Sequence, residues 1–249
     1  MQQLNIGESI IWLNKVDSTN SHIAILARKQ ISEGVVVAAK FQTEGKGQRG
    51  NVWESQNGMN LTFSVLLYPN FLPVKNQFLI SKITALAICD TLETLVNNTS
   101  IKWPNDIYVG DRKIAGILIE NSFSSNLLDM SIIGIGLNVN QKIFSDDIPN
   151  PTSLHILTQR LFNLDDLLQK LCASLSSRYH QLMCNSIDII SNDYYSKLYR
   201  KEDYYTYKAN GEFFKAKIFG VRDSGELLLK TDSGEIKEFV FKEVSFVID

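Results

Sequence analysis

The sequence predicts an α+β fold in which a mixed β-sheet domain is followed by a small all-β unit. Three observations support this prediction. Apolar runs of strand length alternate with amphipathic helical patterns along the first 200 residues. From about residue 202 the pattern changes to short strands separated by turn sequences. The 249 residues suffice for one sizeable domain and a small one. We therefore expect domains at residues 1–200 and 201–249.

Composition excludes several classes of protein. A net charge of −2 and a pI near 6.0 give no overall basic field, which argues against nucleic acid as the main partner. The cysteines at positions 89, 172 and 184 form no CxxC pair, so we expect buried thiols rather than a zinc site or disulfides. The sequence has no leader-like start and no apolar run of about 18 residues. These features predict a cytoplasmic protein without a membrane segment.

The first elements are a short strand and a helix. Residues 10–13 are apolar, and Asp17-Ser18-Thr19-Asn20 precedes a helical pattern that Gly34 is expected to end. A Ser or Thr hydroxyl at this place can cap the helix. The same hydroxyls and amide, at the positive end of a helix, can instead bind a polar group of a ligand. Both interpretations remain open at this point.

Residues 35–41 form a continuous apolar run, typical of a strand buried on both faces, and lead into a glycine-rich segment at residues 42–55. This segment contains Gly45, Gly47 and Gly50 together with the cations Lys46 and Arg49. Glycine permits positive φ angles and close approach of backbone N–H groups, so the segment could fold around a phosphate or carboxylate. A mobile polar surface loop is the alternative.

The spacing of these glycines also matches two well-known loops, but the context excludes both. A dinucleotide-binding loop opens a helix, whereas the alternating apolar residues 61–67 that follow here predict a strand. A kinase loop requires HRD and DFG motifs downstream, and neither motif occurs in the sequence.

The middle of the chain predicts a long helix at residues 74–97, a hairpin and one further strand. The Gly110-Asp111 turn joins residues 107–109 to Lys113–Glu120, and residues 130–139 form the next strand. Pro104 belongs at a sheet edge or break, which leaves Asn105 and Asp106 directed toward a site or engaged in a turn. Lys113 is either an exposed edge lysine or a functional cation.

The last 90 residues contain two helices and the small unit. Asn163 is placed to cap a helix whose apolar positions run to Leu175, and residues 187–199 form a second amphipathic stretch. Turns at 223–225 and 232–234 then separate the short strands of an all-β unit of about 45 residues.

Several of these polar residues together would suit one kind of chemistry. If the glycine-rich segment, Lys102, Asn105, Asp106 and Lys113 converge with Asn138, they would suit Mg²⁺ and a nucleoside triphosphate. Trp53 could stack on the base. Positive charge would then allow a carboxylate to attack an α-phosphate that otherwise repels it. The three histidines are isolated, and their spacing predicts no metal site.

Five motifs, in this order and spacing, resemble those of the biotin–protein ligases, which are similar in fold to lipoate ligases. The resemblance covers about residues 8–140, and the C-terminal segment looks like the small Src-homology-3-like barrel of that family. The motifs are Asp17–Asn20, Gln42–Trp53, Lys102–Asp106, Lys113–Glu120 and Gly134–Asn140.

The resemblance implies a cytoplasmic, Mg²⁺-dependent enzyme that makes biotinyl-5′-AMP from biotin and ATP and transfers biotin to a lysine of a carboxylase's carrier domain. It implies that Lys113 and Arg49 are catalytic and that Asp106 serves the Mg²⁺. The implied biotin-binding residues are Ser18, Thr19, Asn20, Gln42, Gly45, Lys46, Gly47, Gln48, Lys113 and Gly116. The implied ATP-binding residues are Arg49, Asn51, Trp53, Lys102, Asn105, Asp106 and Asn138.

Two departures from the family pattern stand out. Relatives commonly carry arginines where this chain has Lys46 and Gln48. Lysine keeps the positive charge but lacks the bidentate guanidinium group, and glutamine lacks both. The sequence also starts directly at the catalytic domain, whereas some relatives begin with a helix-turn-helix domain, so we expect no operator binding. A lipoate or octanoate transferase and a non-catalytic biotin or nucleotide sensor are the alternatives, and sheet-edge pairing into a homodimer stays open.

Overall fold

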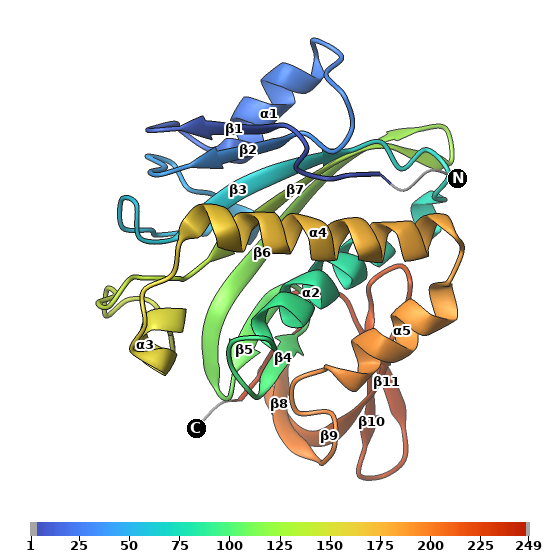
Figure 1. The fold of residues 1–249 in the computed structure, drawn as a ribbon. Helices are drawn as coiled ribbons and strands as arrows, with labels where there is room; N and C mark the ends of the chain where they lie inside the picture. Colours follow the sequence, from blue (N-terminus) through green and yellow to red (C-terminus); the bar gives the residue numbers. More distant parts are fainter. Residues whose placement is uncertain (1–3, 248–249) are drawn as a thin grey trace.

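The computed structural model describes residues 4–247 and contains a seven-stranded mixed sheet, shown in Figure 1. The strand order is β1-β2-β3-β7-β6-β5-β4, and β1 pairs with β2 in parallel while the other neighbours are antiparallel. The strands are β1 (Ile10–Leu13), β2 (Val36–Ala39), β3 (Leu61–Leu67), β4 (Thr99–Lys102), β5 (Asp106–Val109), β6 (Arg112–Ser124) and β7 (Leu127–Leu137).

Helices cover both faces of this sheet but unequally. The short helix α1 packs on β2, β3 and β7 from one side, whereas α2 and α4 lie across the other side and α5 packs beside them (Figure 1). The helices are α1 (Thr19–Ala27), α2 (Phe78–Leu92), α3 (Leu154–Thr158), α4 (Leu164–Met183) and α5 (Ile187–Ser196), with 3-10 turns at Val74–Asn76 and Gln48–Gly50.

The side chains of β3 show why the two faces differ. Leu61, Phe63 and Val65 alternate toward α2 and α4 and join the main hydrophobic core. Thr62 and Ser64 point to the other face, where α1 covers only part of the sheet. Large apolar residues therefore fill one face, and small polar ones leave room on the opposite face.

The C-terminal unit is a separate five-stranded antiparallel sheet with the order β11-β10-β9-β8-β12. Its strands are β8 (Tyr205–Ala209), β9 (Glu212–Val221), β10 (Leu227–Thr231), β11 (Ile236–Phe239) and β12 (Val244–Phe246). The predicted α+β fold, with a mixed sheet and a small all-β unit after it, is confirmed. The domain boundary at residue 200 stays a prediction.

Three contacts fasten the β9–β10 turn of the small unit to the large domain. The Lys82 ammonium, 1% exposed, lies 2.6 Å from the Asp223 carboxylate. The Phe78 N–H donates to the Asp223 carbonyl, and the Trp103 indole donates to the Gly225 carbonyl over 2.9 Å. These contacts hold the Trp103-Pro104 segment in a defined position against the β9–β10 turn of the small unit.

Replacing Asp223 with asparagine is expected to destabilise the protein by about 2 kcal/mol, because the buried Lys82 ammonium loses its counter-charge while one amide oxygen still accepts its hydrogen bond. Urea unfolding at pH 7 measures this change. Glu235→Gln removes an exposed carboxylate and serves as the control, with an expected change under about 0.5 kcal/mol. Equal midpoints for the two variants would show that the Lys82–Asp223 pair does not stabilise the fold.

The boundaries of two predicted helices are wrong. Helix α1 ends at Ala27, where the Gln30 N–H closes a turn on the Ala27 carbonyl with a φ of +56°, well before Gly34. Helix α2 covers residues 78–92 rather than 74–97, because Asn98 turns the chain into β4, a strand that the prediction lacked. Cys184 is exposed, contrary to the expectation that all three thiols are buried.

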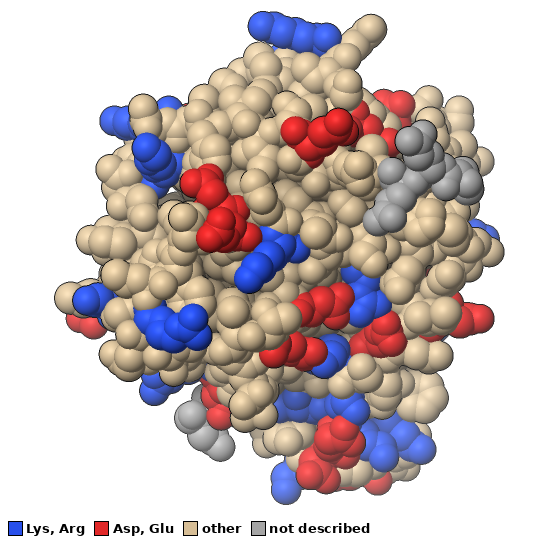
Figure 2. All heavy atoms as spheres, in the orientation of Figure 1, with Lys and Arg blue, Asp and Glu red and all other residues tan. Residues whose placement is uncertain are grey.

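The surface carries charges of both signs. On the face shown in Figure 2, acidic and basic side chains are interspersed rather than gathered into one extended patch. Among the residues that the structure describes, no helix combines the length and apolar character that crossing a bilayer requires.

Candidate active site

A cavity of about 320 Å³, called here the main cavity, lies on the sheet face that α1 leaves partly open. Its floor consists of small residues on three neighbouring strands, since Thr62 pairs with Gly136 and Gly136 pairs with Gly116. A Cβ atom at Gly134 would lie 2.4 Å from the Asn20 Oδ1, and one at Gly136 would lie 2.2 Å from the Trp53 ring. Only glycine leaves space for these two side chains.

One end of the cavity is polar but uncharged. The Gln42 Oε1 accepts a 2.7 Å hydrogen bond from the Thr19 backbone N–H, so glutamine caps the helix from a distant strand end. Ser18 occupies the N-cap position, yet its side chain makes no capping bond. The capping interpretation of Ser18 is therefore wrong, and its buried hydroxyl lines the cavity instead.

Hydrogen bonds fix the amide groups at this end. The Ser64 hydroxyl lies 2.5 Å from the Asn20 Oδ1, and the Asn20 Nδ2 donates to the Glu120 carboxylate over 2.7 Å. Because the Gln42 Oε1 is taken by Thr19, the Gln42 NH₂ group is the end that can donate to a ligand. The cavity thus offers hydroxyl groups and a fixed amide donor in one small region.

The glycine-rich segment folds into a tight turn of its own. The Trp53 N–H donates to the Gly45 carbonyl over 2.9 Å, and the Gly47 N–H donates to the Asn51 carbonyl over 2.7 Å. A Cβ atom at Gly45 would lie 2.3 Å from the Trp53 carbonyl oxygen. Gly45 is therefore required for the close approach of the two arms of the turn, a reason that the sequence did not suggest.

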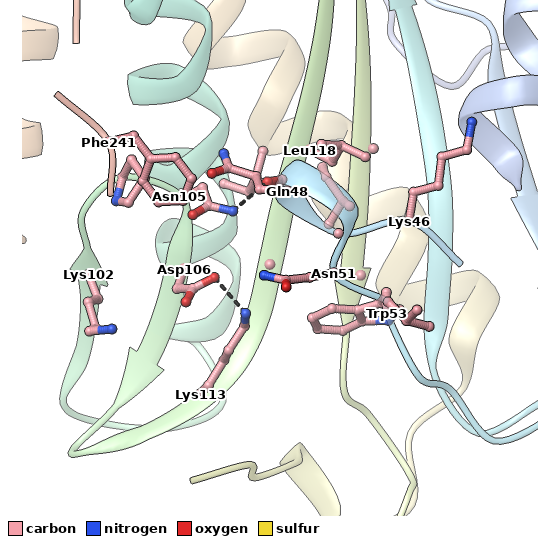
Figure 3. A pocket seen from close by; sticks show the side chains of 18 of the residues that line it. Lys46, Gln48, Asn51, Trp53, Lys102, Asn105, Asp106, Lys113, Leu118 and Phe241 are labelled. Atoms are coloured by element: carbon pink, nitrogen blue, oxygen red, sulfur yellow. Dashed lines mark hydrogen bonds and ion pairs between the residues drawn. The ribbon is translucent and has the colours of Figure 1, made fainter. Parts of the chain in front are cut away.

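The Trp53 ring lies on the floor glycines Gly116 and Gly136, between the polar end and the charged end of the cavity. Figure 3 shows the ring beside Lys113. Its indole Nε1 is buried and has no hydrogen-bond partner in the described chain. The Lys113 Nζ lies 5.5 Å from the centre of its ring. An unpaired buried donor costs free energy, so this N–H group suits an acceptor supplied by a ligand.

The other end of the cavity is cationic. The Lys113 Nζ and the Asp106 Oδ1 form a 2.7 Å ion pair between β6 and β5 (Figure 3). The Asn105 Nδ2 donates to the Ile117 carbonyl over 2.8 Å, which holds the Trp103–Asn105 turn against β6. Asp106 is the one carboxylate among the described lining residues, whereas four lysines line the cavity: Lys46, Lys102, Lys113 and Lys242.

The Lys102 ammonium is held between aromatic rings. Its Nζ lies 5.2 Å from the centre of the Tyr108 ring and 5.4 Å from that of Phe246, a residue of the small unit. Burial lowers the pKa of Lys102, and the neighbouring charges of Lys113 and Arg200 act in the same direction against the opposing effect of Asp106. A bound phosphate would favour the charged form and reverse this shift.

If the nucleotide is the ATP that the resemblance of the motifs implies, we expect the KM for ATP to rise with pH, beginning below the ordinary lysine pKa of 10.5, because deprotonation of Lys102 removes a positive charge that a phosphate needs. The pH profile of the adenylate formation that the resemblance implies, followed at saturating biotin, measures this effect. Lys102→Arg keeps its charge at every accessible pH, so its KM for ATP should not show that rise. A rise of the same size in both proteins would contradict the assignment to Lys102.

The donor set fits Mg²⁺ only as an ion that arrives with a nucleotide. Within residues 4–247, no group of three or more His, Cys, Asp or Glu side chains could hold a metal ion. Mg²⁺ commonly uses one or two protein carboxylates and completes its shell with phosphates and water. Asp106 can supply one such oxygen once an anion takes Lys113 from it.

Most of the predicted site residues line the main cavity. They are Ser18, Thr19, Asn20, Gln42, Lys46, Gly47, Gln48, Asn51, Trp53, Lys102, Asn105, Asp106, Lys113 and Gly116. Gly45 and Asn138 do not line it, and Asn138 is buried and donates to the Thr152 carbonyl instead. The Arg49 side chain lies outside the described part of the structure. The Lys46 ammonium donates to the Ser21 hydroxyl on α1, away from Lys113 (Figure 3).

Three groups of residues at the cavity were not predicted as site residues. The floor glycines Gly134 and Gly136 belong to a motif but were assigned no role in the site. Thr62 lines the cavity, and Ser64 contacts it through its hydrogen bond to Asn20. Both interrupt an apolar strand at alternate positions, a signal that could have placed them on the polar face of the sheet. The small unit contributes Phe241, Lys242, Val244, Ser245 and Phe246, for which the sequence gives no local signal.

Comparison with known proteins points to one family. The model of the biotin/lipoate A/B protein ligase family matches residues 12–138. The bifunctional ligase/repressor BirA of Bacillus spizizenii is 31% identical over 238 residues, which cover 92% of this chain and 71% of the relative. The biotin–[acetyl-CoA-carboxylase] ligase of Mycobacterium tuberculosis is 30% identical over 188 residues, or 72% of this chain and 68% of the relative.

A solved structure gives the same answer at the level of the fold. The biotin protein ligase from Aquifex aeolicus, in complex with biotin and ATP, superposes with a TM-score of 0.81 and 29% sequence identity. The match covers 97% of this chain and 100% of that one, the small C-terminal unit included. By sequence profile, by relatives over most of its length and by fold, the chain belongs to the biotin/lipoate A/B protein ligase family.

Proposed function

We propose that the chain is an ATP-dependent biotin–protein ligase. In the first step an oxygen of the biotin carboxylate bonds to the α-phosphorus of ATP, and pyrophosphate leaves with the electrons of the broken P–O bond. In the second step a lysine amine of a biotin carboxyl carrier domain bonds to the carbonyl carbon, AMP leaves, and the amine loses one proton to solvent. The products are a biotinyl amide, AMP and pyrophosphate.

The observation that carries this proposal is the pairing of an uncharged polar end with a cationic end in one cavity. Biotin has the same two-part character, since its ureido ring offers hydrogen-bond donors and an acceptor and its tail ends in a carboxylate. Ser18, Thr19 and the Gln42 NH₂ group suit the ring, and the lysine-rich end suits the carboxylate and the phosphates. The similar Aquifex aeolicus structure holds both biotin and ATP.

The polar end also favours biotin over lipoate. The dithiolane ring of lipoate has no strong hydrogen-bonding group, so it would leave the hydroxyl and amide groups around Gln42 unpaired. A site built to hydrogen-bond its substrate rejects an analogue that lacks those groups by large factors. Biotin is therefore the substrate that the residues present at this end favour.

Lys113 is the cation that we assign to the reacting carboxylate and phosphate oxygens. Two anions approach each other in the first step, and a fixed positive charge beside them lowers the repulsion. In this structure the Lys113 ammonium is paired with Asp106, so arrival of an anion would exchange its partner and free Asp106 for the Mg²⁺ of MgATP. The separate roles of Lys102, Asn105 and Asn51 on the nucleotide side belong to the same proposal.

Mass spectrometry of the adenylate tests the function directly. The protein is incubated with MgATP and either biotin or lipoate, and the small-molecule products are identified. We expect biotinyl-5′-AMP with biotin and no adenylate with lipoate. Formation of lipoyl-AMP alone would indicate a lipoate ligase, and formation of neither adenylate would indicate a non-catalytic binding protein.

A further inference from the structure

A second cavity of about 320 Å³, called here the side cavity, adjoins the main cavity. It lies between the start of α2, strand β6 and the turns of the small unit that contain Gly225 and Val240. Six residues line both cavities, namely Gln48, Trp103, Pro104, Asn105, Ile117 and Phe241. The two spaces therefore meet around the Trp103–Asn105 turn.

The two cavities differ in charge. The side cavity has one charged lining residue in the described chain, the carboxylate of Glu226, whereas lysines dominate the main cavity. The remaining walls are apolar or uncharged, with Phe78, Ile119 and the half-exposed Val240 among them. This combination repels phosphate and suits a cation on a long apolar stem.

The shared residue Gln48 adds an independent observation. Its Oε1 atom is buried and has no hydrogen-bond partner in the described chain. Gln48 lies beside Asn105 where the two cavities meet (Figure 3). An unsatisfied buried acceptor suits an N–H donor from outside the chain. An arginine at this position would repel an incoming ammonium group, whereas glutamine can accept a hydrogen bond from it.

The walls of the side cavity are held in place by the rest of the fold. The Trp103 indole donates to the Gly225 carbonyl, and the Phe78 N–H donates to the Asp223 carbonyl. The Ser224 hydroxyl donates to the Glu226 carboxylate at the wall of the side cavity. The walls of the side cavity are therefore defined by hydrogen bonds between the large domain and the small unit.

We propose that the side cavity is the entrance for the acceptor lysine, with the Glu226 carboxylate attracting its ammonium group and Gln48 receiving it at the junction with the main cavity. The lysine stem of four methylene groups lies along Phe78, Ile119 and Val240, and the amine reaches the carbonyl carbon of the acyl-adenylate after it loses a proton to solvent. This inference rests on the proposed function and names the route of the second substrate.

The test separates the two half-reactions in the full-length protein. Glu226→Gln is compared with Glu238→Gln, which changes an exposed carboxylate of the same unit outside both cavities. Each protein is assayed for biotin-dependent pyrophosphate exchange, for transfer to a purified biotin carboxyl carrier domain, and for release of biotinyl hydroxamate with hydroxylamine as a small nucleophile. Val240→Trp, which narrows the mouth of the side cavity, is a second variant.

We expect Glu226→Gln to lower kcat/KM for the carrier domain about tenfold, with pyrophosphate exchange and hydroxamate formation within about twofold of the unchanged protein. Val240→Trp should show the same selective loss, and Glu238→Gln should show none. If both Glu226→Gln and Val240→Trp transfer biotin to the carrier domain at the unchanged rate, the entrance proposal is wrong, while the proposed function still holds. Absence of pyrophosphate exchange in the unchanged protein would overturn the proposed function and the inference with it.

Discussion

Replacing Lys113 with alanine is expected to lower the rate of biotinyl-adenylate formation about 100- to 1000-fold, because the variant lacks the ammonium group that offsets the repulsion between a carboxylate and a phosphate. The fold should persist, since the Lys113–Asp106 ion pair is partly exposed, with 27% and 19% of the side chains accessible, and such pairs contribute about 0–1 kcal/mol. Biotin-dependent pyrophosphate exchange gives the rate, and thermal unfolding gives the stability.

Arg112→Ala is the matched control for this experiment. Arg112 is the neighbouring residue on β6, is exposed and does not line the main cavity. Both variants lose one positive charge from the same hairpin, so a general electrostatic effect would appear in both. Pyrophosphate exchange in Lys113→Ala at the rate of Arg112→Ala would contradict the role assigned to Lys113.

Replacing Gly136 with alanine is expected to weaken biotin binding about 100-fold while the protein still folds. The new methyl group would lie 2.2–2.6 Å from three atoms of the Trp53 indole ring, so the ring must leave the floor of the cavity. Forcing the ring back against the added methyl group when biotin binds would cost the free energy of an overpacked contact, about 1–3 kcal/mol, and the upper part of this range corresponds to about 100-fold in affinity. Isothermal titration calorimetry with biotin measures the affinity, and tryptophan fluorescence reports the displaced ring.

Gly220→Ala provides a control with the same chemical change. Gly220 is a strand glycine of β9 with open space around its Cβ position, so the added methyl group meets nothing within 4 Å. We expect its biotin affinity to equal that of the unchanged protein. Full biotin affinity in Gly136→Ala would show that the glycine floor does not shape the site.

The sequence predicted those elements whose local residue pattern matches their burial and contacts in the folded protein. Asn163 caps α4 as expected, because its Oδ1 accepts from the Asp165 and Asp166 N–H groups. The apolar run that became β2 is buried at every position, as continuous hydrophobicity indicated. Helix α2 was predicted too long because Leu95 and Val96 continue its apolar periodicity from a turn, where they pack on the same core.

The site could be predicted only in part. Motif positions such as Gln42, Trp53 and Lys113 do converge on one cavity, but their contacts depend on tertiary structure. The cap that Gln42 provides to α1 spans 23 residues, and the link from Asn20 to Glu120 spans 100 residues, so neither is visible as local spacing. The same holds for Phe246, which reaches Lys102 from the second sheet.

The central claim is that a single cavity holds biotin by an uncharged polar end and brings its carboxylate to ATP beside Lys113. A crystal structure of the protein with biotin and a non-hydrolysable ATP analogue tests it most directly. We predict the ureido ring near Thr19 and Gln42, and the biotin carboxylate within hydrogen-bond distance of the Lys113 Nζ. Biotin or the nucleotide bound away from the glycine floor and from Lys113 would contradict the claim.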